Sequence, residues 1–188
     1  ALTFGGHEKT YQSWFGVTKE QLLENRRQNP YTYENEIDNY KQDHYQFHWN
    51  QKLNQKWSTN LGLNYTYGRG YFEQFRDDDS IETYGGIVVS DIDQQGNKTG
   101  TTDLIRRRWL DNNFYVLNAS ANYKTSKLNL TFNSSFSTYS GDHYGEVIWA
   151  RNFNENSSVR DRYYNGNGKK TDFSVFAKAS YLLSNKLS

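Results

Sequence analysis

The chain has 188 residues, a net charge of +1, 17% aromatic residues and a mean hydropathy of −1.01. No apolar run approaches the roughly 20 residues of a membrane-spanning helix, which excludes a helical membrane protein, and the small net charge argues against nucleic-acid binding. The absence of cysteine excludes disulfides, thiolate metal sites and a cysteine nucleophile.

The predicted elements are β-strands near residues 39 to 53, 57 to 75, 106 to 124, 128 to 141 and 170 to 183, with residues 1 to 11 as the end of a further strand. Within the runs, apolar and polar residues alternate with a period of two, which puts them on opposite faces of a sheet. The residues predicted on one face are Leu61, Leu63, Tyr65, Leu117, Ala119, Ala121, Leu128, Leu130, Phe132, Phe173, Val175 and Ala177, and those on the other are Asn64, Asn118, Ser120, Asn129 and Asn133.

The length of these runs and the chemistry of their polar face favour a membrane β-barrel over a soluble sandwich. A tilted strand that crosses a bilayer needs about 9 to 11 residues, whereas strands of soluble domains usually have about 5 or 6. The polar face is rich in Asn, Ser, Thr and Gly, and aromatic residues lie near the strand ends. Both features are typical of outer-membrane barrels with a water-filled or plugged lumen.

The predicted connections alternate strictly between short and long. Residues 53 to 56, 124 to 127 and 183 to 186 are short polar turns that each contain a lysine, whereas residues 13 to 38, 76 to 105 and 142 to 169 are long. This is the arrangement of short periplasmic turns and long extracellular loops. The first long loop is predicted to contain a short helix, because Thr18 can cap it, Gln21 can reach back to the cap, and Pro30 follows.

Two charged stretches of the chain could carry a function. Asp77 to Asp79, with Asp91 and Asp93, suggest a calcium loop, but Thr102 stands where a bidentate Glu is needed, so no metal site is predicted. We expect Arg106, Arg107 and Arg108 to be solvated or to pair with lipid head-group phosphate.

The histidines give no sign of catalysis. His44 and His48 share one strand face with Gln46 and are predicted to face the lumen. His143, beside Asp142 and between two glycines, is predicted to lock a tight turn, with ligand contact as the alternative. No Ser/His/Asp spacing, phosphate-binding loop or carboxylate pair stands out, so we expect neither an enzyme nor a cofactor.

Several short stretches together carry a resemblance to a known family. Among them are Tyr65-Thr66-Tyr67-Gly68, Arg108-Trp109-Leu110-Asp111-Asn112 and Gly141-Asp142-His143-Tyr144-Gly145, and all of them lie within residues 10–17, 25–26, 29–30, 36–46, 65–74, 108–115, 141–151 and 170–181. In this combination the chain resembles the middle of the barrel of TonB-dependent outer-membrane receptors, of the siderophore or vitamin type.

The resemblance implies a 22-stranded barrel in the outer membrane of a Gram-negative bacterium, closed by an N-terminal plug. Such a receptor imports a scarce ligand, such as an iron–siderophore, haem or cobalamin, with energy delivered through TonB. Residues 1 to 188 would belong to the single barrel domain, with the plug outside them, as the lack of Met and of a signal peptide also leads us to expect. The implied partners are the small-molecule or metal-chelate ligand, the TonB complex through the plug, and outer-membrane lipid.

Two other classes remain open from the sequence. A secreted carbohydrate-binding β-sandwich would use exposed Tyr and Trp to stack on sugars. A small lipid-carrier barrel would close on itself with its apolar face inward.

Recognition is predicted in the long loops, because loops present side chains to solvent while the turns only return the chain. The candidate ligand-binding residues, all expected in extracellular loops, are Trp14, Tyr31, Tyr33, Trp109, His143, Tyr144 and Trp149. Five full strands are fewer than the about 8 that the smallest barrels need, so the sheet is predicted to be open. Its free edges and apolar patch should make the excised chain self-associate.

Overall fold

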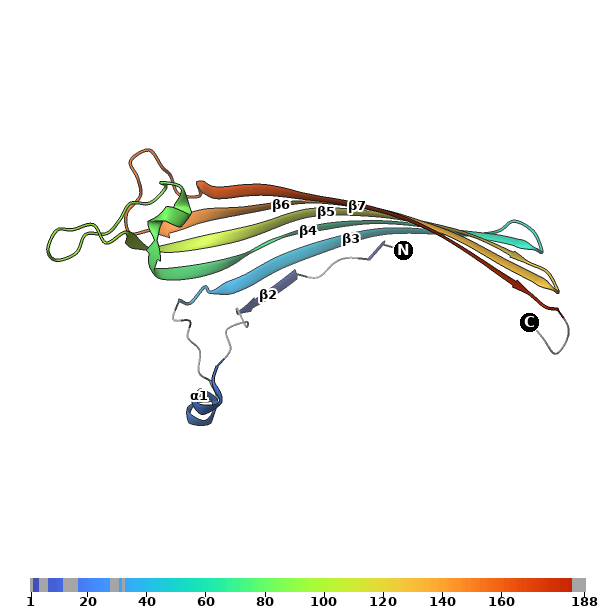
Figure 1. Ribbon diagram of the computed structural model, residues 1–188, viewed down its shortest axis with the longest axis horizontal. Helices are drawn as coiled ribbons and strands as arrows, with labels where there is room; N and C mark the ends of the chain where they lie inside the picture. The colour runs from blue at the N-terminus through green and yellow to red at the C-terminus, as the bar shows by residue number, and fades with distance from the viewer. Residues whose placement is uncertain (1, 4–6, 12–16, 28–30, 32, 184–188) are drawn as a thin grey trace.

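The computed structural model describes residues 2–3, 7–11, 17–27, 31 and 33–183. Within these residues it is an all-β structure with one short α-helix and one 3-10 turn (Figure 1). The elements are β1 (Leu2–Thr3), β2 (His7–Tyr11), α1 (Lys19–Glu24), β3 (Ile37–Lys52), β4 (Trp57–Ser80), η1 (Ile81–Tyr84), β5 (Thr101–Lys124), β6 (Leu128–Ala150) and β7 (Arg162–Tyr181).

All the strands form one antiparallel sheet in the order β1-β3-β4-β5-β6-β7, with β2 also paired to β3. From β3 to β7 each long strand pairs with its neighbour in sequence, which confirms the predicted up-and-down meander. The long strands lie side by side in one curved layer (Figure 1). Across the described residues this layer is open, and it has neither the closed wall of a lipid carrier nor the two packed sheets of a sandwich.

The cross-strand register confirms the predicted sorting of side chains. Leu63 pairs with Phe47 on one side and with Leu117 on the other, and Leu117 pairs with Phe136. Directly opposed residues of antiparallel strands lie on the same face of the sheet. We call the face that carries Leu63 face A and the face that carries Asn64 face B. The twelve predicted apolar residues all fall on face A, and the five polar residues fall on face B.

The strands are longer than predicted, and the long connections are correspondingly shorter. β4 and β5 each have 24 residues and β6 has 23, so the long connections contract to residues 81–100 and 151–161. The extra strand residues lack apolar alternation, but polar side chains pair across the ladder, as Asp142 of β6 does with Asn167 of β7 at 2.6 Å. The alternation of short turns with longer connections is retained.

The predicted helix is confirmed as α1. Gln21 donates its backbone N–H to Thr18 Oγ1 at 3.2 Å, and Thr18 donates its own N–H to Gln21 Oε1 at 2.9 Å. Each side chain therefore satisfies a backbone donor that the first turn leaves without a partner. Pro30, expected beyond the end of the helix, lies outside the described residues.

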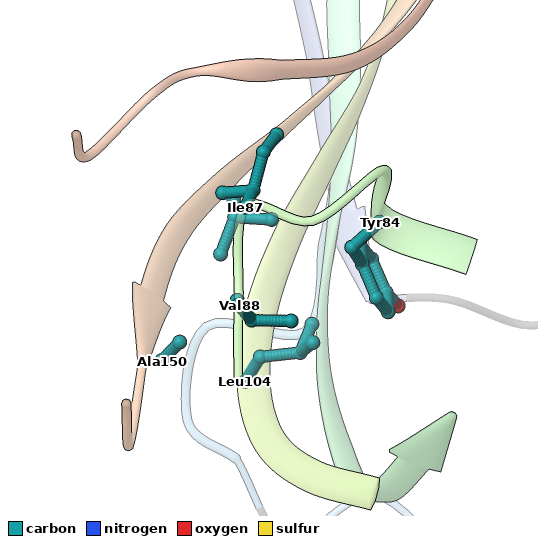
Figure 2. Close-up of a cluster of buried hydrophobic side chains, with 6 residues drawn as sticks. Tyr84, Ile87, Val88, Leu104 and Ala150 are labelled. Atoms are coloured by element: carbon teal, nitrogen blue, oxygen red, sulfur yellow. The ribbon is translucent and has the colours of Figure 1, made fainter. Parts of the chain in front are cut away.

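A small hydrophobic core lies at the long-connection end of face B. Tyr84, Ile87 and Val88 come from the β4–β5 connection and pack with Leu104, Val147 and Ala150 of β5 and β6 (Figure 2). Phe153 and Tyr163 pack around them. The connection thus folds back over face B and does not extend wholly into solvent.

Candidate functional site: the two faces of the sheet

Face A carries an apolar band between two aromatic rows. Trp57 and Tyr123 form the row nearest the short turns, with ring centroids 5.0 Å apart. Tyr65 stacks on Tyr45 at 5.7 Å and on Tyr115 at 4.6 Å, and these three rings form the other row. The side chains between the rows are large, apolar and partly to largely exposed; they include Phe47, Trp49, Leu61, Leu63, Leu117, Phe132, Phe136, Phe173 and Val175. A continuous exposed apolar surface of this kind marks contact with a membrane or a partner.

The height of the band matches a bilayer. Tyr67, the next ring on face A, lies ten residues beyond Trp57, or about 33 Å along a strand that rises about 3.3 Å per residue. A tilt of about 40°, as in barrels, reduces this to about 25 Å of height, which is the apolar height of outer-membrane barrels. Charged residues begin at the level of Tyr67, which lies opposite Asp43: Lys41 pairs with Asp43 at 3.2 Å, and Arg69 pairs with Asp111 at 3.4 Å.

Above the band, face A carries an aromatic ladder made of Tyr71, Trp109 and Tyr144. The Trp109 ring lies 4.6 Å from Tyr71 and 5.8 Å from Tyr144. Each ring has an arginine guanidinium over it: Arg107 over Tyr71 at 4.3 Å, Arg69 over Trp109 at 5.1 Å and Arg162 over Tyr144 at 3.6 Å. Trp109 Nε1 also donates to Glu146 at 3.0 Å. The ladder is therefore a rigid surface of flat rings and cations.

The buried carboxylate of Glu73 lies next to the ladder, on the side away from the short turns. Glu73 is 1% exposed and accepts hydrogen bonds from Tyr33 Oη at 2.6 Å, Asn35 Nδ2 at 2.7 Å and Arg107 Nε at 2.7 Å. Burial, and then the hydrogen bond to Glu73, raise the pKa of Tyr33 to about 12. These bonds fasten the segment before β3 to β4 and β5.

Face B is a polar wall over the same length. Hydroxyls and amides pair along it, as in Asn60 Nδ2 donating to Ser120 at 2.9 Å and Thr131 donating to Asn122 at 3.1 Å. A hollow of about 340 Å³ is lined mainly by side chains of this kind, together with His48. His44 bonds to Thr66 at 2.9 Å, which places both histidines on the predicted face. The wall offers hydrogen bonds to water or to a polar segment seated against it.

Two glycines allow tyrosine rings to lie flat across face B. A Cβ added at Gly68 would stand 2.1 Å from Tyr40 Oη, and one at Gly141 would stand 2.1 Å from Tyr139 Oη. Asn112 joins the two phenols, donating to Tyr40 at 3.2 Å and accepting from Tyr139 at 2.6 Å. Gly141 thus lies within β6, where it makes room for the Tyr139 ring, and not in a turn.

The arginine cluster differs from the prediction. Arg106 is buried on face B and donates to Tyr84 Oη and Gln74 Oε1, each at 3.1 Å, while Arg107 pairs with Glu73. The expectation of solvated arginines is wrong for these two, because the pairing of β4 with β5 places the Gln74 amide and the Glu73 carboxylate directly opposite them. Arg108 lies over the ring of Phe72 at 5.8 Å.

The aspartates of the proposed calcium loop are used within the protein. Asp91 accepts from Thr102 at 2.9 Å and Asn152 at 2.9 Å and pairs with Arg151 at 3.1 Å. Asp93 accepts backbone N–H bonds from Gln95 and Asn97 in its own turn. Among the described residues there is no group of three or more His, Asp or Glu side chains that could hold a metal ion. In the same part of the chain, no helix has the length and apolar character needed to cross a membrane.

The predicted ligand-binding residues do not gather at one loop surface. Trp14 lies outside the described residues, and Tyr31 and Tyr33 lie in the segment before β3. The loop assignment is wrong for the other four, because Trp109 is in β5, and His143, Tyr144 and Trp149 are in β6.

Of these four, Trp109 and Tyr144 meet in the ladder of face A, and Trp149 also lies on that face opposite Ile105. His143 lies on face B opposite Leu110, within β6 and not in the predicted turn, and its neighbour Asp142 accepts from Asn167 at 2.6 Å. Sequence reasoning missed Arg69, Tyr71 and Glu73. Their spacing of two, which continues the face A positions of β4, was the available signal.

No family model matches the chain, and the searches of curated proteins and of solved structures also return no match.

Proposed function

We propose that the chain forms part of the barrel wall of a TonB-dependent outer-membrane receptor, with face A toward lipid and face B toward the lumen. The observation that carries the proposal is the apolar band of face A, which is bounded by aromatic rows at both ends and is about 25 Å high when Tyr67 is included. A soluble protein would have to cover so large an apolar surface, whereas lipid solvates it directly.

The two ends of the strands support the same orientation. β4 continues from Tyr67 to Ser80, about 40 Å at about 3.3 Å per residue, so its upper half would project beyond the bilayer. The connection 81–100 folds over face B at that end and would narrow the mouth of the lumen. The short turns at the other end would face the periplasm.

In this proposal the whole receptor has 22 strands and a plug, and it imports an iron–siderophore, haem, cobalamin or a similar scarce ligand with TonB-delivered energy. His143, on face B, stays a candidate for contact with that ligand. Trp109 and Tyr144, on face A, would stand outside the barrel above the membrane surface. Their place in the ladder suits contact with lipid head groups better than contact with an imported ligand.

Cysteine scanning tests the orientation, since the chain has no cysteine of its own. In the full-length protein in outer membranes, Asn64→Cys should react with a small water-soluble maleimide, while its neighbour Leu63→Cys should react only with a lipid-soluble one. Equal reaction of both variants with the water-soluble reagent would contradict the membrane orientation. A second experiment measures the growth of bacteria for which each scarce ligand in turn is the limiting nutrient. Growth should need both this protein and TonB, and growth that is independent of TonB would contradict the transport function.

A further inference from the structure

Of the three consecutive arginines at the start of β5, Arg108 differs from its neighbours in its partners. Arg106 and Arg107 each lie near a carboxylate of β4. Arg108 forms no ion pair within the part of the chain that the structure describes. Its Nε donates to Tyr163 Oη at 3.5 Å, and its two terminal nitrogens form no hydrogen bond with the described residues. The outer fork of this half-buried guanidinium is therefore available to a ligand.

The surroundings of Arg108 on face B leave its charge uncompensated. In its own row of opposed residues and in the three rows toward the short turns, the face B positions of β4 to β7 carry a second cation, Lys170, and no carboxylate. In β3 the same row contains Asp38, but Phe72 lies between it and Arg108. This part of face B therefore has a surplus of positive charge, which attracts anions.

Two tyrosine rings lie beside Arg108. The register shift just after Gly145 adds one residue to β7, and a bulge of this kind redirects side chains. A Cβ at Gly145 would collide with the rings of both Tyr163 and Tyr164, so the missing side chain makes room for them on face B. Tyr163 is covered by Tyr84, with ring centroids 4.9 Å apart, whereas Tyr164 is 38% exposed. The ring of Tyr164 is therefore accessible next to the arginine.

In the proposed barrel, Arg108 would lie at the mouth of the lumen. Its partner on β4 is five residues beyond Tyr67, or about 16 Å along the strand above the apolar band. The space toward the lumen is open, because a Cβ added at Gly166 or Gly168 would meet no atom closer than 3.9 Å. A ligand that enters the barrel can therefore approach Arg108 from below the connection 81–100.

We propose that Arg108 binds a carboxylate of the imported ligand, with the ring of Tyr164 and the imidazole of His143 beside it. This inference rests on the proposed function, which sets face B toward the lumen. The planar fork of a guanidinium can hold a carboxylate through two parallel hydrogen bonds. His143, which lies one row from Arg108 on the neighbouring strand, offers a further N–H donor. The ligand is accordingly an anionic, carboxylate-bearing molecule and not a cationic or uncharged one.

The first experiment measures the electrostatic potential beside Arg108 in the full-length protein. Leu110 is the next face B residue of β5 and is 39% exposed, so Leu110→Cys places a thiol there in a chain without cysteine. At low ionic strength this thiol should react several-fold faster with an anionic sulfonate thiosulfonate reagent than with its cationic trimethylammonium analogue, after each rate is divided by that of a free thiol. Arg108→Gln should remove most of this preference. Arg162→Gln, which removes the same charge from face A, is the matched control and should change nothing.

The second experiment compares limiting nutrients of different charge. Ferric citrate and haem carry carboxylates, ferrioxamine B is a cationic iron chelate, and cyanocobalamin has no net charge. We expect growth to depend on this protein with a carboxylate-bearing nutrient. Arg108→Gln should then raise the concentration for half-maximal growth on the order of tenfold, since a hydrogen bond to a charged group contributes about 1.5 kcal/mol or more and 1.4 kcal/mol is tenfold. Arg108→Lys, which keeps the charge, should lose less, and equal amounts of each variant in outer membranes exclude misfolding as the cause.

Each failure has a distinct meaning. An undiminished preference for the anionic reagent in Arg108→Gln would overturn the assignment of the positive site to this residue. TonB-dependent growth on ferrioxamine B or cyanocobalamin alone would overturn the carboxylate ligand and leave the proposed transport function intact. Failure of the labelling test at Leu63 and Asn64 would instead reject the membrane orientation.

Discussion

At the scale of single residues, the most constrained group is the Glu73 carboxylate. It is buried beside Arg107, and Tyr33 and Asn35 also donate hydrogen bonds to it. A buried charge stays in place only when it is paired and hydrogen-bonded, because its desolvation otherwise costs several kcal/mol. Tyr33→Phe should therefore lower the free energy of unfolding by about 1.5 to 3 kcal/mol, measured by urea unfolding in detergent. Tyr181→Phe, at the exposed end of β7, is the control and should have no effect.

The hydrogen bond from Tyr33 to Glu73 should also make the free energy of unfolding depend on pH. The pKa of Tyr33 is raised from its ordinary value near 10 to about 12, so the folded protein favours the neutral phenol. The stability advantage of the native protein over Tyr33→Phe should be complete below pH 10 and should be lost as pH rises through 12. Unfolding of both proteins at pH 8 and at pH 11.5 checks this. An advantage that is equal at both values would contradict the hydrogen bond to Glu73.

At the scale of elements, the connection 81–100 is attached to face B by a second carboxylate. Burial opposes the ionisation of Asp79, but hydrogen bonds from Arg76 and Tyr84 outweigh it and hold the pKa below its usual range. The resulting stability is present above pH 3.8 and is lost as pH falls through the lowered pKa. Asp79→Asn should remove it at neutral pH as well and should loosen the connection without unfolding the sheet.

Hydrogen exchange measures that loosening. The amides of Ile87 and Val89, which bond to Tyr84 and Asn152 carbonyls, should exchange at least several-fold faster in Asp79→Asn, while amides in the middle of β5 should not change. Asp142→Asn, which removes a carboxylate from β6 away from the connection, is the matched control. Unchanged exchange at Ile87 would show that the hydrophobic core alone holds the connection.

How far the sequence predicts these elements depends on the kind of alternation. Apolar alternation from Trp57 to Gly68 predicts the strand and its faces, because a shift of one residue would invert every side chain. Farther along β4 and β5 the face A residues are charged or aromatic and show no apolar alternation. Each pairs with a residue distant in sequence, as Glu73 does with Arg107, 34 residues away. The sequence predicts these two strands as far as residues 75 and 106, but the contacts across them, and the strand ends beyond those residues, follow only from the pairing register. The register also shifts between Ile105 and Arg106, which no local pattern indicates.

At the scale of the whole molecule, the open sheet should control how residues 1–188 behave when expressed alone. Within the described residues β7 pairs only with β6, and its side chains are almost all exposed. An open edge leaves backbone groups that lipid cannot satisfy, each costing several kcal/mol, and face A adds a large apolar surface.

The excised chain should therefore form oligomers in detergent through edge pairing and burial of face A. Sedimentation should give a mass that rises with protein concentration. A proline in place of Ser174, in the middle of β7, should reduce this association by interrupting the exposed ladder, whereas Ser174→Ala should not. A monomer at every concentration would mean that the edge is closed by contacts absent from the sheet described here, and would contradict its assignment as an open wall.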